Sequence, residues 1–386
     1  MPLSEILTHL GEERSQYYNS IAPPVIQTSN FAFDSPESFA EKISNEFEHH
    51  IYTRGNNPTV QILRKKIAAL EKTEDALITS SGVAAVSIAI TSQLSAGDHI
   101  ICVSRPYDWT RKLIENILAR FGVEFDFVDG TNLNSIRDAI KTNTKVIYLE
   151  SPNSKTFEVQ DLRGCVAICQ QHKITSIIDN SHCSPIFQNP IDFGIDLVVH
   201  SGTKYLNGHS DVVLGVICGS EALIRPMFQR EFMTFGPIIS PLEASMVLRG
   251  LRTLDLRVRR SDATAMKIAQ YLEKHPRVSK VYHPLLPSSS QYQLAKSQMS
   301  GNGGLVSVEI DARNTTEMNT FCSHLKKFLL GVSWGGYESL YIPFYPFYDR
   351  LDQNTPSVPF NFIRFYIGLE DFEYLKSDLK HALDSL

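Results

Sequence analysis

Residues 174–204, ITSIIDNSHCSPIFQNPIDFGIDLVVHSGTK, hold the pattern that decides the fold. Two short apolar runs, Ile174 to Ile178 and Asp196 to Val199, are each followed at once by polar residues. Runs of this length that are rich in Ile and Val predict strands buried on both faces, as in a parallel sheet covered by helices. Ligands of such sheets bind just beyond the carboxyl ends of the strands, which is where the polar residues stand.

The same alternation of strand and helix extends toward the N-terminus. Further strands are predicted at 75–79, 98–103 and 145–149, and helices at 84–94 and 162–171. Short buried strands that alternate with helices favour an α/β fold with a mainly parallel, doubly wound sheet.

The length of the chain indicates more than one domain. A single hydrophobic core stops growing well below 386 residues. A long amphipathic helix from about Glu243 to Lys274 is predicted to lead into a smaller α+β domain with strands at 304–310 and 360–367. We therefore expect an extended N-terminal arm, a large domain and a small domain, at residues 1–55, 56–242 and 243–386.

Charge and composition exclude several classes of partner. A formal net charge of -5 gives no electrostatic reason to bind nucleic acid or an anionic membrane. No apolar run approaches the ~20 residues that span a bilayer, and Met1 to Glu13 lacks the features of an export signal. The six cysteines show neither disulfide nor zinc spacing. We expect a cytoplasmic enzyme or binding protein with reduced thiols and no metal.

Polar residues after the predicted strands form one chemical set. Ser80-Ser81-Gly82-Val83 follows the first strand, Asp179 the fourth, and Lys204 lies in the turn after the fifth. Pyridoxal 5'-phosphate (PLP) requires a lysine for covalent attachment, a carboxylate opposite its ring nitrogen and a nest of N–H groups and hydroxyls for its phosphate. These residues would meet at one sheet edge, so the sequence predicts a PLP site centred on Lys204.

Each member of this set also has an ordinary structural explanation. A lysine in a Ser/Gly/Thr turn is usually solvated, Asp179-Asn180-Ser181 is common loop chemistry, and Ser80-Ser81-Gly82 is a plain helix cap. Only the joint placement of the three favours a cofactor site. Dinucleotide, P-loop and serine-hydrolase motifs are absent from the sequence, which argues against a dehydrogenase.

The turn around Lys204 resembles a known family. Ser201-x-Thr203-Lys204-Tyr205-x-x-Gly208-His209-Ser210-Asp211 matches the signature of the Cys/Met-metabolism PLP-dependent enzymes, which have the fold-type-I aminotransferase-like architecture. The resemblance implies covalent attachment of PLP to Lys204 and stacking of Tyr107 on its ring. It also implies that Asp179 pairs with the ring nitrogen, and that the phosphate is bound by Ser201, Thr203 and the backbone of Gly82 and Val83.

Two other segments resemble family elements that complete the site. Tyr52-Thr-Arg54-Gly-Asn-Asn-Pro58-Thr59 is similar to the segment whose Tyr and Arg reach the cofactor of a neighbouring subunit, which implies an obligate homodimer and commonly a homotetramer. Ser333-Trp334 and Arg364 match the elements that bind the substrate carboxylate. A guanidinium can clamp a carboxylate with two hydrogen bonds. Without the resemblance, Arg364 could equally pair with Glu370 or Asp371.

Within the family, the bacterial cystathionine β-lyases resemble the chain most. Trp334 after Ser333 and the form Glu150-Ser-Pro-Asn-Ser154 are β-lyase features. Asp108-Trp109 after Tyr107, and His182-Cys183, depart from the family pattern.

This resemblance implies a lyase of amino-acid metabolism, in transsulfuration and methionine biosynthesis. It would cleave L-cystathionine by β-elimination to homocysteine, pyruvate and ammonia, with Lys204 and Tyr107 as catalytic residues. The alternatives are a cystathionine γ-synthase, a cystathionine or methionine γ-lyase, or a PLP-binding regulator without turnover.

Overall fold

The apolar runs form a seven-stranded sheet in the order β1-β7-β6-β5-β4-β2-β3. The computed structural model describes residues 1–347 and 358–386. The strands are β1 Asp75–Thr79, β2 His99–Val103, β3 Glu124–Val128, β4 Thr144–Glu150, β5 Thr175–Asp179, β6 Leu197–His200 and β7 Gly215–Gly219. Only β7 runs antiparallel to its neighbours, so the prediction of a mainly parallel sheet is confirmed.

Both faces of the central strands of this sheet are buried, which explains why those strands are largely apolar. Along β4, Ile147 and Leu149 pack into one core cluster, while Val146 and Tyr148 pack into another on the opposite face. The helices and short turns of this region are α3 Pro58–Leu70, α4 Gly82–Thr91, α5 Asp108–Lys112, η2 Leu113–Leu118, η3 Ala119–Phe121, α6 Leu133–Asp138, α7 Leu162–His172, α8 Ser184–Phe187, η4 Pro190–Phe193, α9 Glu221–Met227, η5 Phe228–Phe232, α10 Met233–Phe235 and α11 Pro241–Leu251.

The long helix expected over 243–274 is two helices, α11 and α12 (Leu254–Glu273). The carbonyl of Gly250 accepts hydrogen bonds from the Thr253 N–H, at 3.1 Å, and from Arg257 Nη2, at 2.8 Å. These bonds end α11 and turn the chain before α12 begins. The predicted division at residue 243 lies inside α11. Among the described residues, no helix combines the length and apolar character needed to cross a membrane.

A second, five-stranded sheet has the order β10-β11-β12-β9-β8. Its elements are β8 Val278–Tyr282, α13 Tyr292–Gln298, β9 Leu305–Ile310, α14 Thr315–His324, β10 Leu329–Leu330, β11 Leu340–Pro343, η6 Tyr345–Phe347, β12 Phe362–Tyr366 and α15 Phe372–Asp384. Ile363 and Phe365 of β12 pack in one core cluster with residues of α12, α14 and α15. Alternation along the strand therefore points Arg364, which lies between them, to the face away from that core.

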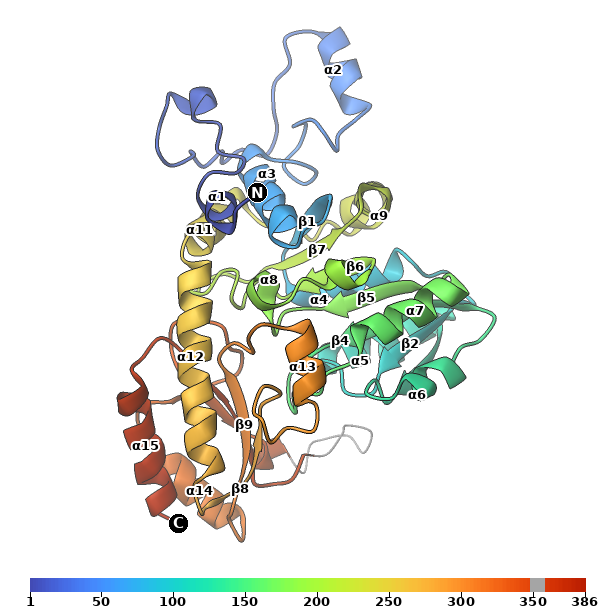
Figure 1. The fold of residues 1–386 in the computed structure, drawn as a ribbon. Helices are drawn as coiled ribbons and strands as arrows, with labels where there is room; N and C mark the ends of the chain where they lie inside the picture. The colour runs from blue at the N-terminus through green and yellow to red at the C-terminus, as the bar shows by residue number, and fades with distance from the viewer. Residues whose placement is uncertain (348–357) are drawn as a thin grey trace.

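The N-terminal segment is only partly an extended arm. Its elements are α1 Leu3–Thr8, η1 Arg14–Tyr17 and α2 Pro36–Ile43. Figure 1 shows α1 beside α3 and α11, whereas α2 and the loops around it project away from both sheets. The projecting part exposes large apolar side chains, among them Tyr18, Ile21, Phe39 and Ile43.

One buried lysine attaches α1 to the sheet region. The side chain of Lys66 on α3 is fully buried, and its Nζ donates to the carbonyl of Ile6 at 2.9 Å. The same Nζ pairs with the buried carboxylate of Glu12 at 3.2 Å, and Arg252 pairs with that carboxylate at 3.3 Å. A buried ion pair of this kind is costly to break because the remaining partner stays buried.

We predict that Lys66→Met lowers the free energy of unfolding by roughly 3 kcal/mol, because it leaves Glu12 buried with one partner fewer. Urea unfolding of the full chain measures the effect. Lys65→Met is the matched control, since Lys65 is exposed on the same helix. Equal stability of the two variants would contradict this role for Lys66.

Candidate active site

A cavity of about 590 Å³ lies at the carboxyl ends of β1, β4, β5 and β6. Most of the residues predicted for the site line it, namely Gly82, Val83, Tyr107, Asp179, Ser201, Thr203, Lys204, Ser333, Trp334 and Arg364. They come from segments as far apart in the chain as Gly82 and Arg364, and the two sheets bring them together.

Lys204 has the environment of a reactive amine. Its Nζ lies 3.3 Å from Ser201 Oγ and 5.6 Å from the centroid of the Trp334 ring. Burial, and then the positive charge of Arg364, lower the pKa of Lys204 to about 8, while the charge of Asp179 acts in the opposite direction. A substantial fraction of this amine is therefore neutral near physiological pH.

The start of α4 forms a cradle for an anion. The first N–H groups of a helix have no partner within the helix, and the helix dipole favours negative charge there. A Cβ at Gly82 would lie 2.8 Å from the Cβ of Ser201, so glycine is needed for this close approach. Thr203 Oγ1, by contrast, is bonded to the backbone N–H and carbonyl of Leu214 at 2.9 and 3.2 Å. Ser201 is therefore freer than Thr203 to bind a phosphate.

These groups fit PLP. Asp179 ends β5 at the cavity, and its Oδ1 accepts the N–H of Ser181 at 2.9 Å, which orients the carboxylate. The amine of Lys204 and the α4 cradle line the same cavity. A lysine, a carboxylate and an anion cradle are the three elements that this cofactor requires.

Two backbone carbonyls hold the guanidinium of Arg364 in place. Its Nη1 donates to the carbonyl of Ser154 at 2.8 Å, and its Nη2 lies 3.4 Å from the carbonyl of Ser333. Among the described residues it has no ion pair. Glu370, the alternative partner, accepts from Ser339 at 2.8 Å, and Asp371 pairs with Arg260 at 2.6 Å. Burial lowers the pKa of Arg364 to about 10, so the guanidinium stays charged at neutral pH.

The segment Ser333–Gly335 packs directly on the lysine loop. Ser333 and Gly335 have φ values of 76° and 91°, and a Cβ at Gly335 would lie 2.8 Å from the Cα of Lys204. Glycine is required at this position for both reasons. The close approach places Trp334, which is 7% exposed, against Lys204 and Tyr205.

Glu150 organises the site, although the sequence marked it only as part of the string Glu150-Ser-Pro-Asn-Ser154. Its Oε2 accepts the N–H of Tyr107 at 2.5 Å and its Oε1 accepts the N–H of Ser154 at 2.9 Å. Burial, and then the charge of the neighbouring Asp179, raise the pKa of Glu150 to about 8. One carboxyl group thus fixes two loops of the cavity.

His182 is a neutral side chain in the cavity wall. Its Nε2 lies 2.8 Å from Asn302 Oδ1, and burial lowers its pKa to about 4. Asn302 Nδ2 donates to the carbonyl of Leu305 at 3.1 Å, so Oδ1 is the atom that faces the imidazole. His182 therefore carries its proton on Nε2 and packs beside Trp334.

Tyr52 and Arg54 do not line the cavity of their own chain. Tyr52 is 44% exposed and forms an isolated β-bridge with Asn30 in the N-terminal segment. The guanidinium of Arg54 lies 5.5 Å from the Tyr52 ring centroid. Their predicted action on the cofactor of a neighbouring subunit stays a prediction.

Comparison with known proteins agrees with this geometry. The model of the family described as Cys/Met metabolism PLP-dependent enzyme matches residues 4–384. The chain is 36% identical to an L-methionine gamma-lyase of Treponema denticola, over 98% of this chain and 96% of the relative. It is 34% identical to a cystathionine beta-lyase of Coxiella burnetii, over 97% and 96%. The solved structure of metB from Corynebacterium glutamicum is 33% identical with a TM-score of 0.93, covering 100% of this chain and 98% of that one.

We predict that the rate of PLP attachment to the apoprotein rises as the pH is raised through about 8, because only the neutral amine of Lys204 reacts with the aldehyde. Arg364→Met removes a neighbouring positive charge and should move this rise to higher pH. Stopped-flow absorbance of the apoprotein mixed with PLP measures both profiles. Arg230→Met, at an exposed position, is the control. An unchanged midpoint in Arg364→Met would refute the electrostatic explanation.

Proposed function

We propose that this chain, which belongs to the Cys/Met metabolism family of PLP-dependent enzymes, is a carbon–sulfur lyase that cleaves L-cystathionine by β-elimination. The products would be homocysteine, pyruvate and ammonia. The observation that carries the proposal is the gathering of Lys204, Asp179 and Arg364 in one cavity.

Arg364 would bind and orient the substrate. A guanidinium has five N–H donors, and the carbonyls of Ser154 and Ser333 occupy only two of them. The remaining donors can hold the α-carboxylate with two parallel hydrogen bonds. This clamp fixes the substrate so that its Cα–H bond can face Lys204.

Asp179, Ser201 and the backbone of Gly82 and Val83 would hold the cofactor, with Tyr107 against its ring. PLP, when bound, supplies a protonated ring that withdraws electrons from the substrate Cα. The carboxylate of Asp179 would hold the proton on the ring nitrogen, and the α4 cradle would hold the phosphate.

Lys204 would move the proton. Its lowered pKa suits a general base that takes the proton from Cα. The electron pair then expels sulfur from Cβ as a thiolate, and the protonated Nζ of Lys204 can return a proton to that sulfur. Burial raises the pKa of Tyr107, so its phenol keeps its proton at neutral pH and can serve as a second donor. The released enamine hydrolyses in water to pyruvate and ammonia.

A second candidate is γ-elimination of L-methionine. It is favoured by the 36% identity to the L-methionine gamma-lyase of Treponema denticola. The β-elimination is favoured by Trp334, the β-lyase feature of the sequence, which packs 5.6 Å from Lys204 Nζ. The two reactions differ in their keto-acid product, since γ-elimination gives 2-oxobutyrate.

We further propose that the working enzyme is a homodimer in which Tyr52 and Arg54 reach the partner's cofactor. These residues lie outside their own cavity, in a segment whose exposed apolar side chains need a covering surface. A homotetramer built from two such dimers stays a prediction.

We predict that the protein loaded with PLP releases pyruvate from L-cystathionine. Lys204→Ala should abolish turnover because the base is lost, and Asp179→Ala should reduce kcat by roughly a hundredfold or more because the ring loses its proton. Coupled assays for pyruvate and 2-oxobutyrate on L-cystathionine and L-methionine decide between the two candidates. Release of 2-oxobutyrate alone would show that the enzyme catalyses γ-elimination. Full turnover by Lys204→Ala would refute the role of Lys204 as the base.

Active-site complementation tests the dimer. Arg54→Ala and Lys204→Ala homodimers should both be nearly inactive, whereas subunits exchanged between them should recover about a quarter of wild-type activity. Recovery is expected because about half of the dimers are then mixed, and each mixed dimer has one intact site of its two. An inactive mixture, with exchange verified by mass spectrometry, would show that Arg54 serves its own chain.

A further inference from the structure

We infer that the ion pair between Asp108 and Lys155 recognises the distal, zwitterionic end of the substrate. The inference rests on the proposed lyase function and deepens it, because it assigns the residues that select L-cystathionine over uncharged thioethers. Both residues belong to this chain's own cavity wall.

The pair stands between two cavities. Lys155 Nζ lies 2.7 Å from Asp108 Oδ1. Both residues line the active-site cavity, and both also line a neighbouring cavity of about 680 Å³. The two side chains are 49% and 20% exposed for Asp108 and Lys155, so a ligand can reach their charged ends.

Hydrogen bonds to the buried Glu150 hold the backbone next to each member of the pair. Asp108 and Lys155 each follow a residue whose N–H donates to Glu150, namely Tyr107 and Ser154. The carbonyl of Lys155 also accepts the hydroxyl of Ser307 on β9 at 2.9 Å. Such support is expected of a recognition element, because a pre-ordered pair loses little entropy when a ligand binds.

The same two loops carry the proposed reaction site. Tyr107 is the predicted partner of the cofactor ring, and the carbonyl of Ser154 positions Arg364, the predicted clamp of the α-carboxylate. Lys155 Nζ lies 5.9 Å from the ring centroid of Phe344, which also lines the active-site cavity. A substrate held by Arg364 therefore has the ion pair in the wall beside it.

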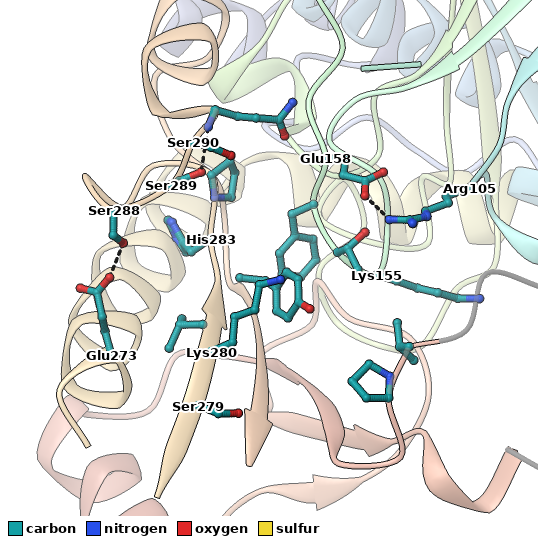
Figure 2. A pocket seen from close by; sticks show the side chains of 18 of the residues that line it. Arg105, Lys155, Glu158, Glu273, Ser279, Lys280, His283, Ser288, Ser289 and Ser290 are labelled. Carbon is teal, nitrogen blue, oxygen red and sulfur yellow. Dashed lines mark hydrogen bonds and ion pairs between the residues drawn. The ribbon is translucent and has the colours of Figure 1, made fainter. Parts of the chain in front are cut away.

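The neighbouring cavity is suited to a charged group. Figure 2 shows its polar wall, with Arg105 paired to Glu158 and Ser288 bonded to Glu273. Lys280 faces the same space with its Nζ 4.4 Å from the Tyr282 ring centroid. The far end of a long substrate can thus extend past the pair into a polar, solvated space rather than into an apolar core.

The chemistry of the pair matches the distal half of L-cystathionine, which ends in an ammonium and a carboxylate. Its ammonium would pair with Asp108 and its carboxylate with Lys155, so that two charge-assisted contacts replace one. No charge is left uncompensated, which keeps the desolvation cost low. The methyl group of L-methionine offers neither contact and leaves the pair closed.

Four thioethers that all release pyruvate test the assignment. They are L-cystathionine, S-(3-carboxypropyl)-L-cysteine without the distal ammonium, S-(3-aminopropyl)-L-cysteine without the distal carboxylate, and S-propyl-L-cysteine without both. Wild type should lose about tenfold in kcat/KM, mainly through KM, for each missing charge. Asp108→Asn should no longer distinguish L-cystathionine from the carboxypropyl compound, and Lys155→Met should no longer distinguish it from the aminopropyl compound.

The matched control is another exposed ion pair, Lys141–Asp126, at 3.0 Å on the edge of the large sheet. Asp126→Asn and Lys141→Met should keep the wild-type preferences. Equal losses on all four thioethers in Asp108→Asn or Lys155→Met, or unchanged preferences, would overturn the assignment.

A failure of the proposed lyase function can be distinguished from a failure of the proposed recognition by the ion pair. If wild type releases no pyruvate from L-cystathionine, dissociation constants of the four compounds are measured from the visible spectrum of the PLP-loaded protein. A preference for L-cystathionine over S-(3-carboxypropyl)-L-cysteine that Asp108→Asn abolishes would support recognition by the pair without this reaction. Equal dissociation constants in wild type would refute it.

Discussion

The two hydrogen bonds that Glu150 accepts, from the N–H groups of Tyr107 and Ser154, are the contacts on which the site depends. A buried carboxyl group without partners is unfavourable, and these two N–H groups satisfy its oxygens. The loops after β2 and β4 are thereby fixed to one another. Tyr107, Asp108 and Lys155 all take their positions from this contact, and so does the carbonyl of Ser154 that holds Arg364.

The charged groups of the site lie close enough together to shift one another's pKa values. Burial, and then Arg364, lower the pKa of Lys204, and Asp179 opposes this effect. Burial, and then Asp179, raise the pKa of Glu150. Cationic and acidic groups are thus placed together where neither is fully solvated. Such a cavity keeps part of the Lys204 amine in its neutral, reactive form.

Local sequence patterns were sufficient to predict those strands whose residue types are characteristic over a few consecutive positions. The runs at 75–79 and 196–199 became β1 and β6 because short apolar runs suit a strand buried on both faces. The antiparallel β7 was not predicted, since a short run such as Gly215–Gly219 gives no sign of its direction. The break between α11 and α12 was missed for a similar reason, because it depends on Arg257 reaching back to Gly250 across a turn.

The sequence by itself determined five of the seven strands of the large sheet, the family and the lysine turn, because apolar runs and the Ser-x-Thr-Lys motif are properties of short segments. Only the tertiary structure decided which polar groups of the site contact one another and which already have a hydrogen-bond partner elsewhere in the chain. It shows Thr203 bonded to Leu214, Arg364 held by carbonyls rather than by Glu370, and Glu150 shared between two loops. Asp108 and Lys155 are 47 positions apart, and no local pattern records their contact. Hydrogen bonding and desolvation depend on distance in space, and the packing of the two sheets sets that distance.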